Sequence, residues 1–531
     1  MLTRVDDLLR CGDPDRPAVT FKDETVSYGE LSRRVGRVAA GLSRIGLRRG
    51  ERVVVYLEKR IETVVAMLAV SAAGGVFVPV NPLFKPRQVG YVASDCGASI
   101  VITTCERHRT LRTALGAVES LRDLVLIGDP AGEPALPLSQ RPRAVMWSQL
   151  SERAATPARG GDEVIDADVA AILYTSGSTG SPKGVVLSHR NLLAGAQSVA
   201  GYLGHTSDDV VLGVLPLSFD TGFSQLTTSF IAGAHVVLVN YLVPREVIRL
   251  CARHGVTGLT CVPPLWLQLA AQKWPDQATR RLRYFANTGG RMPRTTLGWL
   301  REILPRAKPY LMYGLTEAFR STYLDPAEVD RRPDSIGKAI PNAEVLVVRP
   351  DGSVCDPGEE GEIVHRGALV SLGYWNDPER TAERFRPWSP GGSAGGPAGC
   401  DATRTEIAVW SGDTAYRDDD GFLYFVGRTD DMIKTSGYRV SPTEIEEAAY
   451  ATGLIAEAVA FGVPDDNLGQ HVVLAVTGPT GESCDTETLL KALDRDLPRY
   501  MVPRRVVVCS RLPRSGNGKF DRQELRRIVA A

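Results

Sequence analysis

The feature that most constrains this chain is a run of glycine, serine and threonine directly after a buried-strand pattern. Residues 169–173 read Val-Ala-Ala-Ile-Leu, an apolar run of the length expected for a strand covered on both faces. Residues 174–184 then read Tyr-Thr-Ser-Gly-Ser-Thr-Gly-Ser-Pro-Lys-Gly. The three glycines of this run allow positive φ angles and close backbone approach, so consecutive N–H groups can converge on an anion. The pattern predicts a phosphate-binding loop.

The side chains of this loop supply further donors to phosphate oxygens. The donors are five hydroxyls and one ammonium, from Thr175, Ser176, Ser178, Thr179, Ser181 and Lys183. The segment is not a P-loop, because Lys183 is preceded by Pro182 and followed by Gly184, outside the G-x-x-x-x-G-K-[ST] pattern. A flexible Ser/Gly-rich turn is the alternative for any single stretch of this kind. The ordered series Thr-Ser-Gly-Ser-Thr-Gly-x-Pro-Lys-Gly favours the phosphate loop.

Helical and strand-like segments alternate on both sides of the loop. Residues 28–45 carry Leu31, Val35, Val38 and Leu42 at helical spacing. A β-branched run at 52–57 and an Ala-rich helical segment at 62–73 follow, and strand-like runs come at 76–80, 99–103 and 123–127. The same rhythm recurs between 210 and 263. Such alternation predicts an α/β fold with parallel sheets covered by helices.

Length and composition bound the number of domains. A chain of 531 residues is too long for one compact core, and its 43% apolar and 23% charged residues are ordinary for a globular protein. We expect a large N-terminal domain of helix-covered sheets over 1–428 and a small mobile C-terminal α/β domain over 429–531. The boundary follows a tight turn at 418–421 and a short aromatic strand. The low-complexity segment 387–404 is expected to be a flexible surface loop of the first domain.

Charge, cysteine content and hydropathy exclude several classes of protein. The chain has 62 basic and 62 acidic residues, so it has no global field to attract nucleic acid or an anionic membrane. Its 9 cysteines contain no C-x-x-C pair, which argues against a zinc site or a disulfide framework. The N-terminus lacks the apolar core of a signal peptide, and the most apolar stretch, 64–80, fits a helix followed by a buried strand. We expect a cytoplasmic enzyme.

Six motifs, in order along the chain, resemble the signature of the adenylate-forming superfamily. This superfamily comprises acyl-CoA synthetases, adenylation domains of nonribosomal peptide synthetases, and luciferases. The phosphate loop is the first motif. The others are Tyr-Gly-Leu-Thr-Glu at 313–317, Trp-Ser-Gly-Asp at 410–413, Gly-Arg-Thr-Asp at 427–430, Gly-Tyr-Arg-Val-Ser-Pro-Thr-Glu-Ile-Glu at 437–446 and Pro-Arg-Ser-Gly-Asn-Gly-Lys at 513–519. The resemblance implies an AMP-forming acid–thiol ligase that uses ATP and Mg²⁺.

The same resemblance implies a role for each nucleotide-binding residue. The phosphates would be held by Thr175, Ser176, Gly177, Ser178, Thr179, Gly180 and Lys183. Tyr313 would lie against adenine, and Asp413 and Arg428 would contact the ribose. Thr316 would contact the α-phosphate and Glu317 would help to hold Mg²⁺, whose octahedral preference suits a carboxylate together with phosphate oxygens. The alternatives are a turn residue for Asp413 and half of a surface ion pair for Arg428.

Lys519 lies in a short Gly-rich turn, from which a flexible cation can reach into a cleft. By resemblance it bridges the substrate carboxylate and the α-phosphate, where two anions must be brought together. Asp430 would be the hinge about which the small domain turns after adenylation. That rotation would withdraw Lys519 and bring the loop at Gly437 over the site. A solvated lysine in a surface turn is the alternative.

Phe219 and Asp220 bear on the identity of the acid. In amino-acid-activating adenylation domains a Phe-Asp pair is usual, and the Asp binds the α-ammonium of the substrate. A desolvated carboxylate needs a cation, so Asp220 in an otherwise apolar pocket favours an amine. An Asp that caps a turn or helix before Gly222 is the alternative. Gly289 is assigned to the same substrate pocket by the resemblance.

Arg320 follows Glu317 by three residues, in a segment that lines the acyl pocket in relatives. It could pair with Asp220, recognise an acidic group of the substrate, or point outward to solvent. The other pocket candidates are mostly small: Ser224, Cys261, Ala286, Thr288 and Met312. Residues 216–220 and 313–324 are similar to free-standing prolyl-carrier-protein ligases, and also to acyl-CoA-ligase-like proteins of bacterial exosortase systems. L-proline is therefore the expected acid.

The thiol acceptor is expected to be a separate molecule, because the sequence ends soon after the lysine motif without a carrier segment. We expect the phosphopantetheine of a stand-alone peptidyl or acyl carrier protein, as in antibiotic biosynthesis through a pyrrole, or coenzyme A. Two alternatives stay open. One is an acyl- or aryl-CoA ligase in which Asp220 is incidental. The other is a nucleotide-binding regulatory protein, which the presence of Lys519, Glu317 and Asp413 disfavours.

Overall fold

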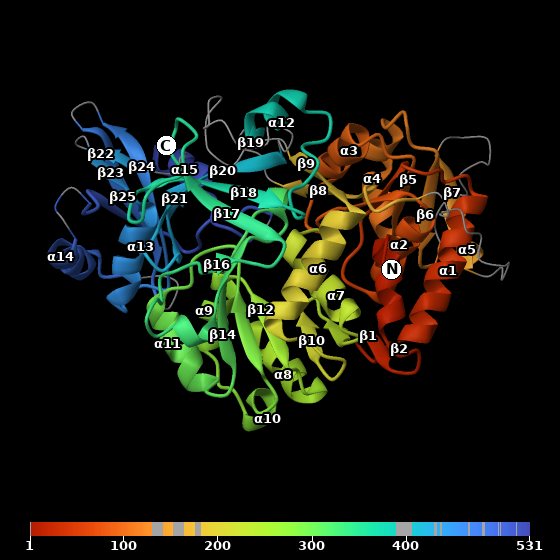
Figure 1. Cartoon of the computed structure of the whole chain (residues 1–531), viewed down its shortest axis with the longest axis horizontal. Coiled ribbons are helices and arrows are strands. Elements are labelled where there is room, and N and C mark those ends of the chain that lie inside the picture. Colours follow the sequence, from red (N-terminus) through yellow and green to blue (C-terminus); the bar gives the residue numbers. More distant parts are fainter. Residues whose placement is uncertain are drawn as a thin grey trace, which may run out of the picture.

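The computed structural model describes most of the chain and forms four sheets with helices packed on them (Figure 1). The described residues are 2–129, 142–151, 164–175, 182–388, 406–428, 433–435, 438–465, 468–479, 484–497, 499, 501–516 and 518–530. No helix within these ranges is long and apolar enough to cross a membrane.

The first large sheet has seven strands, and every neighbouring pair except the last is parallel. In spatial order the strands are β7 (Arg143–Met146), β6 (Asp123–Ile127), β5 (Ile100–Thr104), β3 (Arg52–Val55), β4 (Val76–Pro79), β8 (Val169–Thr175) and β9 (Lys183–Ser188). Its helices are α1 (Tyr28–Arg44), α2 (Ile61–Ala72), α3 (Pro86–Asp95), α4 (Cys105–Gly116) and α5 (Trp147–Ser151). Val53 and Val55 enter one buried cluster and Val54 another, so β3 is covered on both faces.

The second large sheet has nine strands and is parallel from β1 through β14 in its spatial order. In that order the strands are β16 (Lys338–Ala339), β15 (Thr322–Leu324), β14 (Lys308–Tyr313), β13 (Tyr284–Asn287), β12 (Gly258–Cys261), β10 (Val210–Gly213), β11 (His235–Leu238), β1 (Pro17–Phe21) and β2 (Glu24–Ser27). The helices and 3-10 turns are η1 (Val5–Cys11), α6 (His189–Leu203), α7 (Asp220–Ile231), α8 (Pro244–His254), α9 (Pro263–Ala270), α10 (Asp276–Thr279), α11 (Arg294–Ile303), η2 (Thr316–Ala318) and η3 (Pro326–Glu328).

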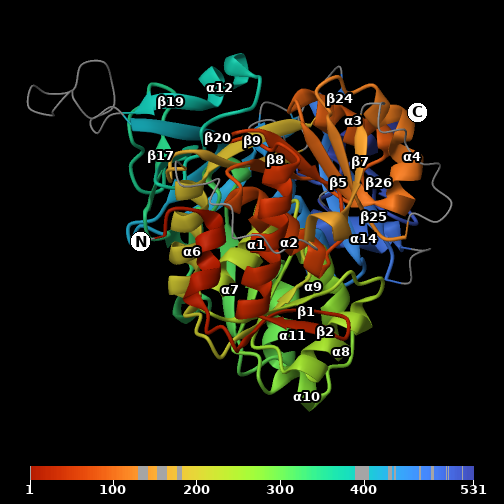
Figure 2. The ribbon, with the colours of Figure 1, turned by 90° about the vertical axis from the view of Figure 1, so that its right-hand side faces the viewer.

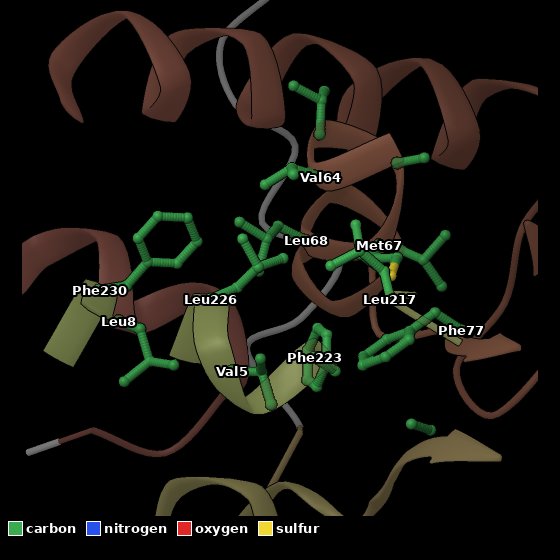
Figure 3. Packing of buried hydrophobic residues seen from close by; sticks show 14 of the residues in the cluster. Val5, Leu8, Val64, Met67, Leu68, Phe77, Leu217, Phe223, Leu226 and Phe230 are labelled. Atoms are coloured by element: carbon green, nitrogen blue, oxygen red, sulfur yellow. The ribbon is translucent and has the colours of Figure 1, made fainter. Parts of the chain in front are cut away.

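The two large sheets share one core, in which α2 meets α7. Figure 3 shows Val64 and Leu68 of α2 beside Leu226 of α7, and Figure 2 shows both helices between the strands of the two sheets. The rings of Phe77 and Phe223 lie 5.1 Å apart in the same core. α2 is apolar nearly all round, as a helix buried between two layers is expected to be. α7 is buried on nearly all sides as well, but it also buries the hydroxyls of Thr227, Thr228 and Ser229. The predicted α/β class with helix-covered parallel sheets is confirmed.

A third, antiparallel sheet was not predicted, because it lies outside the alternating segments. Its strands are β17 (Ala343–Val348), β18 (Gly361–Gly367), β20 (Glu406–Arg417), β19 (Phe385–Trp388) and β21 (Leu423–Arg428), with α12 (Pro378–Arg384) beside them. The predicted turn at 418–421 is present, with the N–H of Gly421 donating to the carbonyl of Asp418. Residues 389–404 of the expected surface loop lie outside the described residues, while Pro387 and Trp388 belong to β19.

The last sheet belongs to a small α/β unit at one end of the molecule, blue in Figure 1. Its strands are β23 (Tyr438–Val440), β22 (Ile433–Thr435), β25 (Gly469–Thr477), β24 (Glu457–Asp465) and β26 (Arg505–Val508). Its helices are α13 (Pro442–Ala451), α14 (Thr486–Asp496) and α15 (Arg522–Ala530). Its two buried clusters contain only residues from Ile433 onward. Within the described ranges, no buried apolar cluster spans this unit and the rest of the chain.

The predicted boundary between residues 428 and 429 adjoins residues outside the described ranges, so it stays a prediction. Polar contacts join the two parts. The Asn81 amide donates to the carbonyl of Gly516 at 2.5 Å, and the Ser441 hydroxyl donates to the carbonyl of Val426 at 2.5 Å. Arg291 and Glu447 form an ion pair at 3.7 Å. Polar interfaces between domains, without a large shared apolar core, permit relative motion.

We predict that Gly195→Ala on α6 destabilises the fold by about 1–3 kcal/mol through overpacking. A Cβ at Gly195 would lie 2.4 Å from Cδ1 of Phe319, whose side chain is fully buried. The matched control is Gly201→Ala on the same helix, where a Cβ meets nothing within 4 Å. Gly201→Ala should stabilise the helix by about 0.5–1 kcal/mol. Chemical denaturation measures both free energies of unfolding, and equal values for the two variants would contradict the packing.

Candidate active site

Strands of the two large sheets lead directly into the predicted site residues. Thr175 is the last residue of β8, and Tyr313 is the last residue of β14. Asn287 ends β13 and is followed by Thr288 and Gly289. Ligands of open α/β sheets bind outside the carboxyl ends of the strands, so these positions are where a ligand is expected.

Lys183, Glu317 and Tyr374 form a closed triangle of hydrogen bonds. The Lys183 ammonium lies 2.8 Å from Oε1 of Glu317 and donates to the hydroxyl of Tyr374 at 2.8 Å. The Tyr374 hydroxyl donates to the same Oε1 at 2.7 Å. The structure therefore brings together the predicted phosphate-binding lysine and the predicted magnesium ligand. Sequence analysis missed Tyr374, which lies more than fifty residues from Glu317 beyond an antiparallel hairpin.

Glu317 is an ionised carboxylate in a mostly dry environment. Burial alone would raise its pKa, but the Lys183 ammonium and the hydrogen bonds from Lys183 and Tyr374 outweigh burial and hold the pKa at about 2. Its side chain is 12% exposed and that of Lys183 is 22% exposed. The pair thus presents a fixed negative and a fixed positive charge beside each other at the end of the nucleotide loop.

The adenine and ribose candidates are also in contact. The Tyr313 hydroxyl donates to Oδ2 of Asp413 at 2.6 Å, and the Asp413 side chain is buried. Arg428 lies opposite Asp413 in the pairing of β20 with β21, which gives the position of its backbone. The ring of Tyr313 stacks on His365 with centroids 6.0 Å apart, and burial lowers the pKa of His365 to about 3. His365 therefore acts as a neutral aromatic support that sequence analysis did not identify.

Lys519 reaches the predicted substrate pocket. Its Cε lies 4.0 Å from the position that a Cβ would occupy on Gly289, a residue with φ of +75°. The turn that carries Lys519 closes through a 2.8 Å hydrogen bond from the Ser515 N–H to the Lys519 carbonyl. Asn81, which follows β4, anchors this turn through its contact with Gly516. The positive φ of Gly289, and the 3.3 Å from a Cβ there to Cγ1 of Val262, explain a glycine at this position.

Phe219 and Asp220 lie at the start of α7. Asp220 is the first residue of the helix, half-buried, and its Oδ1 accepts hydrogen bonds from the N–H and hydroxyl of Thr221 at 2.7 and 3.3 Å. A Cβ on Gly222 would lie 1.9 Å from the Pro216 carbonyl oxygen, so the turn before the helix requires glycine. Asp220 forms no ion pair within the described part of the chain. This geometry suits both the helix-start role and the binding of an ammonium.

A buried lysine, which sequence analysis did not single out, supports the segment that leads to Phe219. The ammonium of Lys59 donates to the carbonyls of Val214 and Leu215 at 2.5 and 3.3 Å. Burial lowers the pKa of Lys59 to about 7. Its two carbonyl contacts fix the chain just after β10, where the predicted acid-recognition residues begin.

Arg320 is buried, which excludes the outward-facing alternative. Its side chain donates from NH1 to the hydroxyl of Thr288 at 2.9 Å. It lines a cavity of about 20 Å³ together with the pocket candidates Ser224 and Met312. Cys261 and Ala286 are fully buried in the core and do not line this cavity.

Some predicted site residues lie outside the described part of the chain. They are Ser176, Gly177, Ser178, Thr179 and Gly180 of the phosphate loop, the hinge residue Asp430, and Gly437. Thr316 is half-buried in η2, one position before Glu317. Among the described residues, Thr175 and Asn287 each hold a buried oxygen without a hydrogen-bond partner. Buried polar atoms of this kind mark positions where a ligand or water completes the hydrogen bonding.

Comparison with known proteins gives matches over nearly the whole chain. A family model described as AMP-binding enzyme matches residues 11–375, and one described as AMP-binding enzyme C-terminal domain matches residues 444–519. A long-chain-fatty-acid–CoA ligase of Salmonella typhimurium is 29% identical over 96% of this chain and 91% of its own length. A feruloyl-CoA synthase of an Amycolatopsis species is 31% identical over 97% of this chain and 96% of its own. A 6% portion of a linear gramicidin synthase of Brevibacillus parabrevis is 30% identical over 96% of this chain.

Two solved structures resemble this one closely. ATP-bound MatB from Rhodopseudomonas palustris has a TM-score of 0.84 at 27% identity and covers 99% of both chains. The o-succinylbenzoate CoA synthetase MenE of Bacillus subtilis, in complex with its acyl-adenylate intermediate, has a TM-score of 0.81 at 26% identity and covers 99% of both chains.

We predict that the free energy of unfolding of Glu317→Gln falls less than that of wild type as the pH is lowered from 7 to 3. Because the pKa of Glu317 is held at about 2, against 4.5 as its ordinary value, its contribution to stability is present above about pH 4.5 and is lost as the pH falls toward 2. That contribution amounts to about 3 kcal/mol. The free energy difference between wild type and variant, from denaturation between pH 7 and pH 3, should shrink over this window. The control Glu119→Gln, at an exposed position, should show no such change, and a constant difference for Glu317→Gln would contradict the ion pair.

Proposed function

This chain belongs to the AMP-binding enzyme family, as its six motifs predicted, and on that premise we propose that it activates a small amino acid with ATP and passes the acyl group to a thiol. It is thus an AMP-forming acid–thiol ligase. Beyond this family activity, we propose the identity of the acid, a carrier protein as the thiol acceptor, and a role for each site residue.

The proposed reaction has two steps at one site. In the first, a carboxylate oxygen of the acid attacks the α-phosphorus of ATP, the bond from that phosphorus to the bridging oxygen breaks, and pyrophosphate leaves. In the second, a thiol loses its proton and its sulfur attacks the acyl carbon, so that the C–O bond to AMP breaks and AMP leaves. Both steps need positioned reactants and compensation of negative charge.

The contact between Lys519 and Gly289 carries this proposal. It brings the lysine of the C-terminal motif to the segment that follows β13, next to the cavity lined by Arg320. From there its ammonium can bridge a substrate carboxylate and the α-phosphate. Thr316 would bind the same phosphate, and the loop from Thr175 to Gly180 with Lys183 would hold the others.

Glu317 fits a role in holding Mg²⁺. Its carboxylate is ionised, and Lys183 and Tyr374 both contact the same oxygen, Oε1. Mg²⁺ in nucleotide sites takes one or two carboxylates together with phosphates and water, so a cluster of protein ligands is not required. When bound, the ion would neutralise charge on the phosphates. Tyr313, Asp413 and Arg428 would hold the adenine and ribose.

The amino acid is inferred from Asp220. Its half-buried carboxylate lies at the start of α7 without a cationic partner among the described residues, so an α-ammonium would compensate it. The similarity of residues 216–220 and 313–324 to prolyl-carrier-protein ligases makes L-proline the first acid to test. A part of a gramicidin synthase, the product of a peptide-assembling system, is among the similar proteins. The phosphopantetheine of a separate carrier protein is the proposed acceptor.

An acyl- or aryl-CoA ligase is the second candidate. Two of the similar proteins are a fatty-acid–CoA ligase and a feruloyl-CoA synthase, and Oδ1 of Asp220 is already engaged by Thr221. In this candidate Asp220 has a helix-start role, and coenzyme A is the acceptor. Both candidate functions include a rotation of the small unit about Asp430. In that rotation the loop at Gly437 would open the path for the thiol. The polar contacts between the two parts support such a motion.

Lys519→Ala should lower ATP–pyrophosphate exchange by roughly 100- to 1,000-fold, because it removes the charge that compensates the α-phosphate during attack. Thioester formation from a synthetic acyl-adenylate should be far less affected. The control Lys491→Ala, an exposed lysine on α14 of the same unit, should leave both steps unchanged. Equal loss of both steps in Lys519→Ala would reject the division of labour.

Exchange assays with L-proline, other amino acids, aryl acids and fatty acids should show turnover with an amino acid. Asp220→Asn should then raise KM for that amino acid by tenfold or more, because a charged hydrogen bond worth about 1.5–3 kcal/mol is lost. Turnover by the wild type with aryl or fatty acids alone, or an unchanged KM in Asp220→Asn, would favour the CoA-ligase candidate.

A further inference from the structure

Arg320 is a buried cation without a carboxylate partner in the part of the chain that the structure describes. The residue is only 4% exposed to solvent. NH1 donates to the hydroxyl of Thr288 at 2.9 Å, and Nε has no hydrogen-bond partner among the described residues. A guanidinium carries five N–H donors and stays charged at any physiological pH. Burial of such a group is costly unless an anion accompanies it.

The neighbours of Arg320 do not supply that anion. The cavity that it lines contains hydroxyls and apolar groups but no carboxylate; its walls include Thr221, Ser224 and Thr260. Tyr202 is also close, but its hydroxyl donates to the sulfur of Met312, and burial raises the pKa of Tyr202, which keeps it neutral. Asp220, the acid expected from sequence as a partner, forms no ion pair with Arg320.

Backbone strain holds Arg320 in this position. Phe319 adopts φ of +52° and ψ of −35°, and the N–H of Arg320 donates to the carbonyl of Ala318 at 2.6 Å. This is a three-residue turn with positive φ, which is rare and strained, above all for a bulky residue. The fully buried ring of Phe319 packs over Gly195 and maintains the turn. Strain of this kind persists where the surrounding packing enforces it, and it gathers at ligand sites.

Arg320 and Lys519 both approach the segment that follows β13, where the reacting end of the proposed substrate would lie. Thr288, the hydrogen-bond partner of Arg320, is followed directly by Gly289, over which the Lys519 side chain lies. Consecutive Cα atoms are about 3.8 Å apart, so the two cations approach adjacent residues of one segment. A short acid with an anion at each end matches this arrangement, with one carboxylate toward Lys519 and the other toward Arg320.

We infer that the acid activated here carries a second carboxylate, bound by Arg320, and is therefore a short dicarboxylic acid or an acidic amino acid. This rests on the proposed adenylation function. It narrows the small amino acid proposed above to an acidic one, or replaces it by a short dicarboxylic acid, and in both cases it argues against L-proline, which the motif similarity suggests. The small cavity beside Arg320 limits the distal group to a few atoms, and the flexible side chain of Met312 in its wall can shift to admit them. An ammonium on the same acid would face Asp220.

The test compares matched acids in ATP–pyrophosphate exchange. L-aspartate, L-glutamate, malonate and succinate are the dianions; L-asparagine, L-glutamine, L-proline and butyrate are the neutral-chain references. Wild type should prefer one of the dianions over its neutral counterpart by roughly 100-fold or more in kcat/KM, because a site built for a buried ion pair rejects the analogue that leaves it unpaired.

Two variants locate that preference in Arg320. Arg320→Met should remove the preference for the dianion by raising its KM, and Arg320→Lys should keep part of that preference. The control Arg245→Met removes an exposed arginine on α8 and should leave the preference for the dianion unchanged. Thermal melting gives a readout without turnover: the preferred dianion alone should stabilise wild type but not Arg320→Met, and Arg320→Met without ligand should melt no lower than wild type, because a buried unpaired charge has been removed.

The two hypotheses fail in different ways. Exchange by wild type with neutral acids only, at rates that Arg320→Met retains, would overturn the second carboxylate and leave the ligase proposal intact. Absence of exchange with every acid would reject the ligase proposal itself, and the substrate class with it.

Discussion

The structure depends on the burial of α2 and α7 between two parallel sheets. Because both helices are enclosed on nearly all sides, the start of α7 has little freedom, and the tight turn before it needs glycine at position 222. Lys59, two residues before α2, donates to a carbonyl that follows β10. The residues proposed to recognise the acid therefore project from the end of a buried helix, a placement that suits a site that must align reacting groups.

Much of this arrangement could be read from the sequence. The alternating segments between residues 28 and 263 predicted the parallel sheets, and the strand ending at Thr175 placed the nucleotide loop. The spacing of apolar residues within one segment shows which faces of a helix or strand are buried, so these elements can be recognised from local sequence alone. Of the antiparallel sheet from β17 to β21, the sequence predicted the turn at 418–421 and the aromatic strand after it, but not the pairing of its strands, which the segment 389–405 interrupts along the chain.

The electrostatic detail could not be read from the sequence, because it depends on contacts between distant residues. Lys183 and Glu317 were each assigned a ligand, yet they neutralise each other across 134 positions, with Tyr374 as the third member. The sequence left three orientations open for Arg320. The positive φ of Phe319 turns it inward, and nothing in the residue types around it signals a strained turn. Sequence motifs identified the chemistry of the site, while tertiary packing determined how its charges are compensated.

The separation of apolar cores between the large part of the chain and the final unit has an energetic consequence. Polar groups such as those of Asn81 and Arg291 exchange their partners for water at little cost in free energy, whereas parting a shared apolar core would expose surface to solvent. On the proposed rotation of the small unit, the arrangement with Lys519 over Gly289 would convert to a second one without exposing a shared apolar core. Binding of nucleotide, and later the loss of pyrophosphate, would then shift the population between the two arrangements. The order of the two proposed chemical steps would follow from which ligand occupies the site.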